Sequence, residues 1–306
     1  MGLNLTALDD FVNSTAGEVI PRVVFEGYTT SILPVKTGIK FSTPLNIMDV
    51  DLVIQNGDCV STPSGSLIAT QQTLQVTKRT SFDALCLDQL DRTYLGISAL
   101  EPGSYNETFA LATNYTDMLV NQFKKADDAF LWGDRSGSAT PGLGHLTSAA
   151  NTGVVVPAAA TGSVDSTTIL NIMDTLIENL DADVAERDDL TIWMSVGNFR
   201  KYVTALRKEN TYHFDPSSIA NRKGILQMQY PFQNVQVVGT TGISGDRICL
   251  MPNAYTVVGV DLESDETNFS LFFDINSDTL KHRIKSKLGV AVAFPEYVVS
   301  NGLAAQ

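Results

Sequence analysis

The segment Ile32–Thr80 constrains the fold most, because it is rich in strand-forming residues that cannot all be buried within the segment itself. Val50, Leu52 and Ile54 alternate with polar neighbours, which is the period of a β-strand with one apolar face. The sequences QNGD and TPSGS in its middle are typical of turns. The segment therefore predicts a long β-hairpin with a polar tip. Such a hairpin is marginally stable alone, so its apolar side chains need a neighbour.

A long amphipathic helix is predicted farther along the chain. Ser104 and Glu107 form a capping box, and apolar residues then recur at steps of three, four or seven. The helix should run from about 105 to Trp132, a length of about 40 Å at about 1.5 Å per residue. It should end at GDRSG, where we expect Gly133 and Gly137 to take positive φ. The expected apolar stripe consists of Leu111, Ala112, Tyr115, Met118, Leu119, Ala126 and Phe130.

Shorter helices and strands fill the rest of the chain, in an order that predicts an α+β fold. Residues 1–31 read as an extended arm with one short helix. Helices are expected over 81–95, over 159–180 and over 198–210, and a polar loop over 211–224. The helix at 159–180 has one apolar face, formed by Ile169, Ile172, Met173, Leu176, Ile177 and Leu180. Strands are expected over 190–195, 234–240, 247–251, 254–261, 269–275 and 279–294.

The charge of the chain argues against several partners. The 306 residues carry 21 basic and 34 acidic side chains, a net charge of −13, and no block of basic residues stands out. An acidic surface repels phosphates, which argues against direct binding of DNA or RNA. No apolar run approaches the length of about 20 residues that spans a bilayer, and the N-terminal sequence lacks the features of a signal peptide, so no membrane partner is expected.

The three cysteines, Cys59, Cys86 and Cys249, are far apart and odd in number. This pattern favours reduced thiols in a cytoplasm. Cys86 stands among apolar positions, which is typical of a structural thiol rather than a nucleophile.

The glycine-rich stretch 131–146 could bind phosphate, flank a nucleophile or end a helix. It lacks both Gly-Lys-Ser/Thr and GxGxxG, and it follows a helix, whereas phosphate loops follow a strand. No G-x-S-x-G sequence is present, and a hydrolytic triad would have to be assembled from His145, His213 or His282 in unrelated segments. These features favour the end of a helix.

Two pairs of closely spaced carboxylates are candidate metal ligands. Asp49 with Asp51, and Asp181 with Asp183, lack the glycine and distant glutamate of a calcium loop, and no His/Cys cluster supports a transition metal. Solvated faces explain both pairs better. The sequence thus predicts no catalytic, cofactor-binding or metal-binding residues and no cofactor. The residues alone indicate a self-associating structural protein.

The sequence DDAFLWGDRSGSATPGLGHLTSA resembles the end of the spine helix in tailed-bacteriophage major capsid proteins of the Hong Kong 97 fold. In that family an apolar helix end meets a GDG-type turn, and Arg135 stands here in place of the second glycine. LTIWMSVGNFRKYV is similar to the family's strand, NP-x-x-W turn and helix, with Phe199 at the aromatic position. Segments like the other helix and strands of the family follow in the same order, so the similarity covers about residues 20–302.

The resemblance implies a division of the chain into named parts. These are an N-terminal arm (1–31), an E-loop hairpin with its P-domain base strands (32–80), a P-domain with the spine helix at about 105–132 (81–183), an A-domain (184–262) and closing P-domain strands (263–306).

The resemblance also implies a function. The chain would assemble with itself into hexamers and pentamers of an icosahedral phage head that encloses double-stranded DNA without sequence-specific binding. Portal, scaffolding and cement or decoration proteins would be its other partners, and its location would be the virion capsid, assembled in the host cytoplasm. The alternatives are an encapsulin-type nanocompartment shell, a hydrolase using His145 or His213, and a monomeric carbohydrate- or receptor-binding module.

Some members of the family join an E-loop lysine to an asparagine of a neighbouring subunit. Residues 41–77 contain no lysine, and Lys36, Lys40 and Lys78 lie at the expected base of the hairpin. A hairpin arm of about 15 residues extends about 50 Å, so lysines at its base do not reach contacts at its tip. We therefore expect a shell without covalent cross-links.

Overall fold

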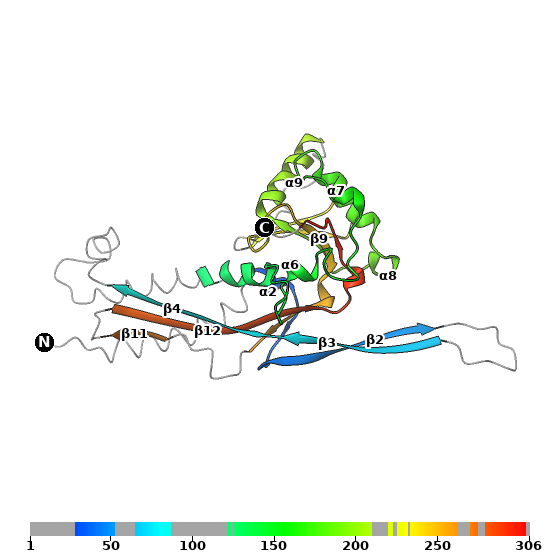
Figure 1. The fold of residues 1–306 in the computed structure, drawn as a ribbon. Coiled ribbons are helices and arrows are strands. Elements are labelled where there is room, and N and C mark those ends of the chain that lie inside the picture. The colour runs from blue at the N-terminus through cyan, green and yellow to red at the C-terminus, as the bar shows by residue number, and fades with distance from the viewer. Residues whose placement is uncertain are drawn as a thin grey trace.

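A computed structural model describes residues 28–52, 65–86, 122–123, 125–209, 220–222, 225–231, 233–261, 270–274 and 279–303. This part of the chain contains a two-stranded hairpin, a five-stranded sheet and a six-stranded sheet. Figure 1 shows the hairpin and the far end of the five-stranded sheet extending in opposite directions, with the six-stranded sheet and its helices above them.

The predicted hairpin is confirmed. Strands β2 (Ser42–Leu52) and β3 (Gly65–Gln75) pair antiparallel in continuous register, and the tip at 53–64 lies outside the described residues. Ile39, Leu74, Val76 and Ala291 form a small buried cluster at the base of the hairpin. This cluster fixes the hairpin to the body, while most of its length projects away from it (Figure 1).

The five-stranded sheet is built around one long strand, β12 (Thr279–Val292). β4 (Thr77–Cys86) pairs with it antiparallel over ten successive positions, and β10 (Thr256–Val260) and β11 (Ser270–Asp274) also pair with it antiparallel. β1 (Val35–Lys36) adds to β10 in parallel. The prediction of a helix over 81–95 is therefore wrong for residues 81–86, which belong to β4. Pairing along β12 outweighs the local helical pattern there. Residues 87–95 lie outside the described part.

The six-stranded sheet has the order β13-β9-β5-β8-β7-β6. Its strands are β13 (Val299–Ser300), β9 (Ile248–Pro252), β5 (Leu190–Ser195), β8 (Gln236–Thr240), β7 (Ile225–Gln229) and β6 (Ala220–Arg222). The buried strand predicted at 190–195 is confirmed. The polar loop predicted over 211–224 contains the short strand β6, and its first part lies outside the described residues.

Helices α7 (Ile169–Glu178) and α9 (Val196–Lys208) pack on this sheet. The predicted apolar face of α7 is confirmed, since Ile169, Ile172, Met173 and Leu176 are buried and Ile177 and Leu180 are partly buried against the same core. Ser195 caps α9 by accepting a hydrogen bond from the backbone N–H of Asn198.

Packing and strand pairing connect residues on the two sides of two predicted domain boundaries, at 184 and at 262. A boundary at 184 separates α7 from α9, yet the two helices share one apolar core. A boundary at 262 places β10 with the six-stranded sheet, yet β10 pairs with β12. A second core cluster joins the two sheets, with Trp132 and Trp193 at ring centroids 5.3 Å apart.

Several short helices complete the described part: α2 (Tyr28–Ile32), α6 (Leu143–Leu146), η1 (Ala158–Ala160), α8 (Ala182–Ala185), η3 (Asn253–Tyr255) and η4 (Pro295–Tyr297). None of the described helices is long and apolar enough to cross a membrane.

Candidate functional site

The glycine-rich stretch after the long helix is a packed turn. The helical segment 125–132 ends at Trp132, as predicted. Of the residues before 125 in the predicted helix, the structure describes only 122–123. Gly137 takes a positive φ of 80°, as expected. The expectation for Gly133 is wrong, because the second positive φ in this turn belongs to Arg135, at 35°. The non-glycine residue thus occupies the left-handed position in the GDRSG turn, where L residues are uncommon.

Gly142 and Gly144 are needed because the chain returns against the end of the helix. A Cβ atom at Gly142 would lie 2.0 Å from the carbonyl oxygen of Gly133, and one at Gly144 would lie 2.4 Å from that of Trp132. Backbone fills the space beside both glycines, which leaves no room there for a phosphate. The helix-ending interpretation of this stretch therefore holds.

The buried side of the helix end differs from the predicted stripe. Ala126 is exposed and Phe130 is half-buried, whereas Asp127, Asp128 and Leu131 are buried. Asp127 and Asp128 are tolerated inside because each has partners. This part of the predicted stripe is thus corrected.

Asp128 and Trp132 tie the helix end to α2 and to the six-stranded sheet. The Asp128 carboxylate accepts a hydrogen bond from the Thr29 backbone N–H at 3.2 Å and one from the Thr240 hydroxyl at 3.4 Å. The indole N–H of Trp132 donates to the Thr29 hydroxyl at 2.9 Å. Burial raises the pKa of Asp128, although its hydrogen bonds oppose the shift. No local sequence pattern indicated these long-range contacts.

Asp127 ties the helix end to β4 through an ion pair with Arg79. The Arg79 guanidinium lies over the Phe130 ring at 4.5 Å, and that of Arg135 lies over the same ring at 3.7 Å. Burial raises the pKa of Asp127 to about 7, against the opposing effect of Arg79. Burial also lowers the pKa of Arg135 to about 10.

The raised pKa of Asp127 predicts a pH-dependent contribution to stability. A carboxyl group whose pKa is higher in the folded state binds a proton more tightly there, so its stabilising effect is lost as the pH rises from 3.8 to about 7. Asp127 should contribute at most about 1.4 kcal/mol per pH unit to the slope, because it binds one proton. Denaturant unfolding of the unassembled chain measures the slope, and Asp127→Asn should remove the contribution of Asp127 while leaving that of Asp128, whose pKa burial also raises. An unchanged pH profile in Asp127→Asn would contradict the assignment.

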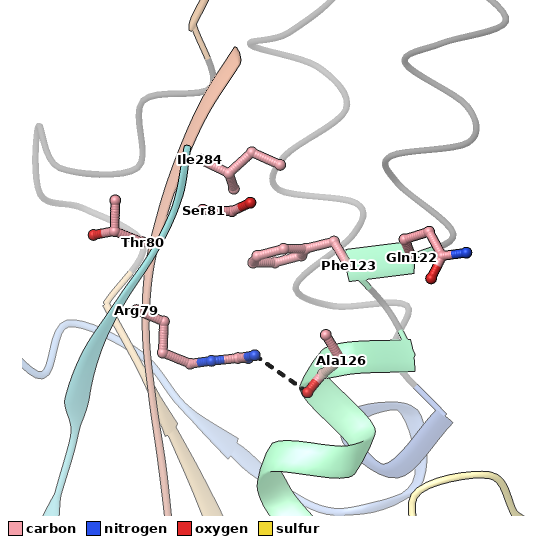
Figure 2. A pocket seen from close by; sticks show the side chains of 7 residues that line it. All are labelled: Arg79, Thr80, Ser81, Gln122, Phe123, Ala126 and Ile284. Atoms are coloured by element: carbon pink, nitrogen blue, oxygen red, sulfur yellow. Dashed lines mark hydrogen bonds between the residues drawn. The ribbon is translucent and has the colours of Figure 1, made fainter. Parts of the chain in front are cut away.

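A pocket of about 300 Å³ lies between the β4–β12 ribbon and the helix (Figure 2). The Arg79 guanidinium reaches across it and donates to the Ala126 carbonyl at 3.2 Å. Arg79 is the one charged residue among the described residues that line the pocket, and its guanidinium contacts the Asp127 carboxyl group. The pocket is lined by Arg79, Thr80, Ser81, Gln122, Phe123, Ala126 and Ile284.

The histidines considered for catalysis are not assembled into a site within the described residues. His145 lies on α6, with its Nδ1 3.5 Å from the Asp134 carboxylate, and His282 lies on β12 opposite Asp83. Burial lowers the pKa of His282. His213 lies outside the described residues.

Among the cysteines, Cys249 is a buried free thiol, and burial raises its pKa to about 11, which disfavours the reactive thiolate. The side chains of Cys59 and Cys86 lie outside the described part, so their reduced state stays a prediction.

The two carboxylate pairs lie on different elements. The Asp181 side chain caps α8 by accepting from the backbone N–H of Asp183, and Asp49 and Asp51 lie on β2. No group of three metal-ligating side chains was found among the described residues.

The hairpin has the surface expected of an assembly element. Met48, Val50 and Leu67 are 65%, 64% and 62% exposed, and the strand register places them on one face. Ile68, on the other face, is also exposed. A patch of this kind on a projecting two-stranded element indicates an interaction surface.

Comparisons with known proteins identify the fold. No protein-family model and no curated protein matches the sequence. A structure of a virus-like particle from Pyrococcus furiosus matches with a TM-score of 0.53 at 12% identity, over 94% of this chain and 97% of that one. The capsid of an empty GTA particle matches with a TM-score of 0.58 at 11% identity, over 90% and 88%. A structure titled Microbacterium phage Oxtober96 matches with a TM-score of 0.53 at 10% identity, over 90% of each chain.

These matches cover nearly the whole chain. The protein has the α+β fold of the Hong Kong 97-type capsid proteins, as the sequence resemblance implied. The hairpin and the helix that ends at Trp132 lie where the sequence resemblance implies the E-loop and the spine helix.

Proposed function

We propose that this protein is the major capsid protein of a tailed bacteriophage. Its copies assemble into hexamers and pentamers of an icosahedral head that encloses double-stranded DNA. The observation that carries the proposal is the match of nearly the whole chain to shell-forming proteins, including the GTA capsid. The uncovered apolar face of the hairpin supports it, because such a face needs a neighbouring copy.

The protein acts mechanically in this proposal and catalyses no reaction. Portal, scaffolding and cement or decoration proteins are its further partners, and the virion capsid, assembled in the host cytoplasm, is its location. The net charge of −13 suits a container for DNA, since an acidic wall repels phosphates and lets the packaged polymer slide.

The proposal predicts that the expressed protein forms capsomers or closed shells of megadalton mass. Size-exclusion chromatography and negative-stain electron microscopy of the full chain, alone and with any scaffolding protein encoded beside its gene, measure this directly. A chain that stays monomeric under all these conditions contradicts the proposal.

Two further measurements on the same particles refine the assignment. A boiled and reduced denaturing gel should show only the monomer, because no lysine lies between residues 41 and 77 to form a covalent link. Particles purified from infected or induced cells should contain nuclease-protected DNA. A protein cargo in place of DNA would favour the nanocompartment alternative.

A further inference from the structure

Arg247, the residue before β9, carries a buried charge without a partner. The residue is 1% exposed, and none of its three guanidinium nitrogens has a hydrogen-bond partner among the described residues. Taking an unpaired charge out of water is unfavourable, so buried charged side chains normally have a hydrogen-bonded partner. Burial accordingly lowers the pKa of Arg247. A guanidinium keeps its proton in proteins, so Arg247 remains a cation that needs an acceptor.

The backbone on both sides of Arg247 is held in place. The Asn301 side chain accepts a hydrogen bond from the Ile248 N–H at 3.1 Å and donates one to the Asp246 carbonyl at 2.7 Å. Cys249, two positions farther along the same face, belongs to the buried cluster that joins the two sheets. Moving the guanidinium into solvent would disturb these contacts, so an acceptor has to come to it.

Asp134 is a carboxylate near Arg247 that is weakly held. It interacts electrostatically with Arg247, but the two side chains form no ion pair in the described structure. The Asp134 side chain is 45% exposed, and its contact with His145 Nδ1, at 3.5 Å, is not a hydrogen bond. Its backbone lies against α6, since a Cβ atom at Gly144 would lie 2.8 Å from the Asp134 nitrogen. Asp134 is therefore free to change partners.

The backbone next to Asp134 is strained. Arg135 has a φ of 35°, in a region that residues other than glycine seldom adopt. Such conformations raise the free energy and are often found where a segment switches between two arrangements. The peptide between Asp134 and Arg135 rotates as a unit, so relief of the strain at Arg135 changes the backbone conformation at Asp134 as well.

We propose that Asp134 and Arg247 form a latch with two states. In the open state, which the structure describes, the Asp134 carboxylate lies beside His145 and Arg135 has its positive φ. In the closed state the turn relaxes and the carboxylate accepts hydrogen bonds from the Arg247 guanidinium. Closing ties the end of the long helix to the start of β9. The latch is a property of the folded chain and does not depend on the capsid function.

The closed state exchanges a weak contact for a strong one. A half-exposed carboxylate beside an imidazole gains little from the pair. A carboxylate on a guanidinium forms short, charge-assisted hydrogen bonds, often two in parallel. The opposing effect is the loss of water from the Asp134 carboxylate. Because closing also relieves the backbone strain at Arg135, we expect the closed state to predominate in the unassembled chain.

The test is a double-mutant cycle on the unassembled full chain, read as the equilibrium constant of unfolding in denaturant. Asp134→Ala should raise this constant at least about tenfold in the wild type, because Arg247 is then buried without an acceptor. In Arg247→Met, which carries an apolar side chain there, the same substitution should change it less than about twofold. Equal effects in both backgrounds, or no effect in either, overturn the inference.

Two controls separate the latch from other partners of these residues. In a His145→Gln background Asp134→Ala should keep its full effect. Loss of the effect there would assign Asp134 to His145 and overturn the latch. Inorganic phosphate should stabilise the wild type and Arg247→Met equally. A gain that requires Arg247, together with no effect of Asp134→Ala, would identify an anion as the partner and overturn the latch as well.

A second pair of variants leaves both latch residues unchanged and tests the strain. Arg135→Gly and Arg135→Ala both remove the guanidinium, but only glycine adopts a positive φ without strain. Since the positive φ belongs to the open state, Arg135→Gly favours that state. The effect of Asp134→Ala should be at least about threefold smaller in Arg135→Gly than in Arg135→Ala. Equal effects in these two backgrounds would overturn the two-state turn.

Discussion

Gly142→Ala should destabilise the folded chain by about 3–5 kcal/mol, a loss that only a few kinds of substitution reach. The added methyl group would lie 2.0 Å from the carbonyl oxygen of Gly133 and 3.0 Å from that of Leu131. Both atoms belong to the backbone at the end of the spine helix, where Leu131 is fully buried. The turn therefore has to move away from the helix, which disturbs the core around Trp132 and Trp193. Denaturant unfolding of the unassembled protein measures the loss.

Gly162→Ala is the matched control. A Cβ atom at Gly162 meets nothing within 4 Å, and its backbone does not have positive φ. The same chemical change should therefore alter the free energy of unfolding by less than about 0.5 kcal/mol. Similar losses for Gly142→Ala and Gly162→Ala would show that close backbone packing does not explain the glycine in the turn.

Shortening the hairpin should abolish shell assembly while the body of the protein stays folded. Residues 47–70 are replaced by Asn-Gly, which joins the paired residues Asn46 and Gln71 through a two-residue turn. The buried cluster at the hairpin base, which includes Leu74 and Val76, is retained. The variant lacks the exposed apolar side chains described on the projecting strands, Met48, Val50, Leu67 and Ile68, so it loses the surface that would contact a neighbour.

Thermal unfolding of the unassembled variant and electron microscopy of concentrated samples measure the two parts of this prediction. Both strands must be shortened together, because deletion of residues 56–71 alone would remove most of β3 and leave most of β2 without its partner strand. As a second variant, Met48→Asp/Leu67→Asp keeps the hairpin and alters only its apolar face. Shells of normal size from both variants would show that the hairpin is not needed to hold neighbouring copies together.

The elements best predicted from the sequence are those whose signals are local. The alternation in β2, the apolar face of α7 and the glycine-rich end of the spine helix each follow from neighbouring residues, and each is present in the structure. The strand β4 was mistaken for a helix from Ser81 to Cys86, because its conformation depends on β12, about two hundred positions farther along the chain.

The site depended on contacts that a local pattern does not reveal. The aspartates Asp127 and Asp128 look like ordinary solvated residues of a helix, and only the fold brings Arg79 and Thr29 to them. The positive charges of β12, by contrast, have a signal in the sequence. They do not form a continuous block, but Lys281, Arg283, Lys285 and Lys287 alternate with the period of a strand, which places four cations on one face.

The length of β12 has a consequence for how a shell withstands force. Its 14 residues form one unbroken strand of about 46 Å, joined to β4 along most of that length. Antiparallel ladder bonds lie perpendicular to the strands, so tension along β12 shears many of them at the same time instead of peeling them one after another. In the proposed capsid, outward pressure from packaged DNA would pull on each subunit from its edges. A long strand loaded in shear would give the wall of such a capsid tensile strength.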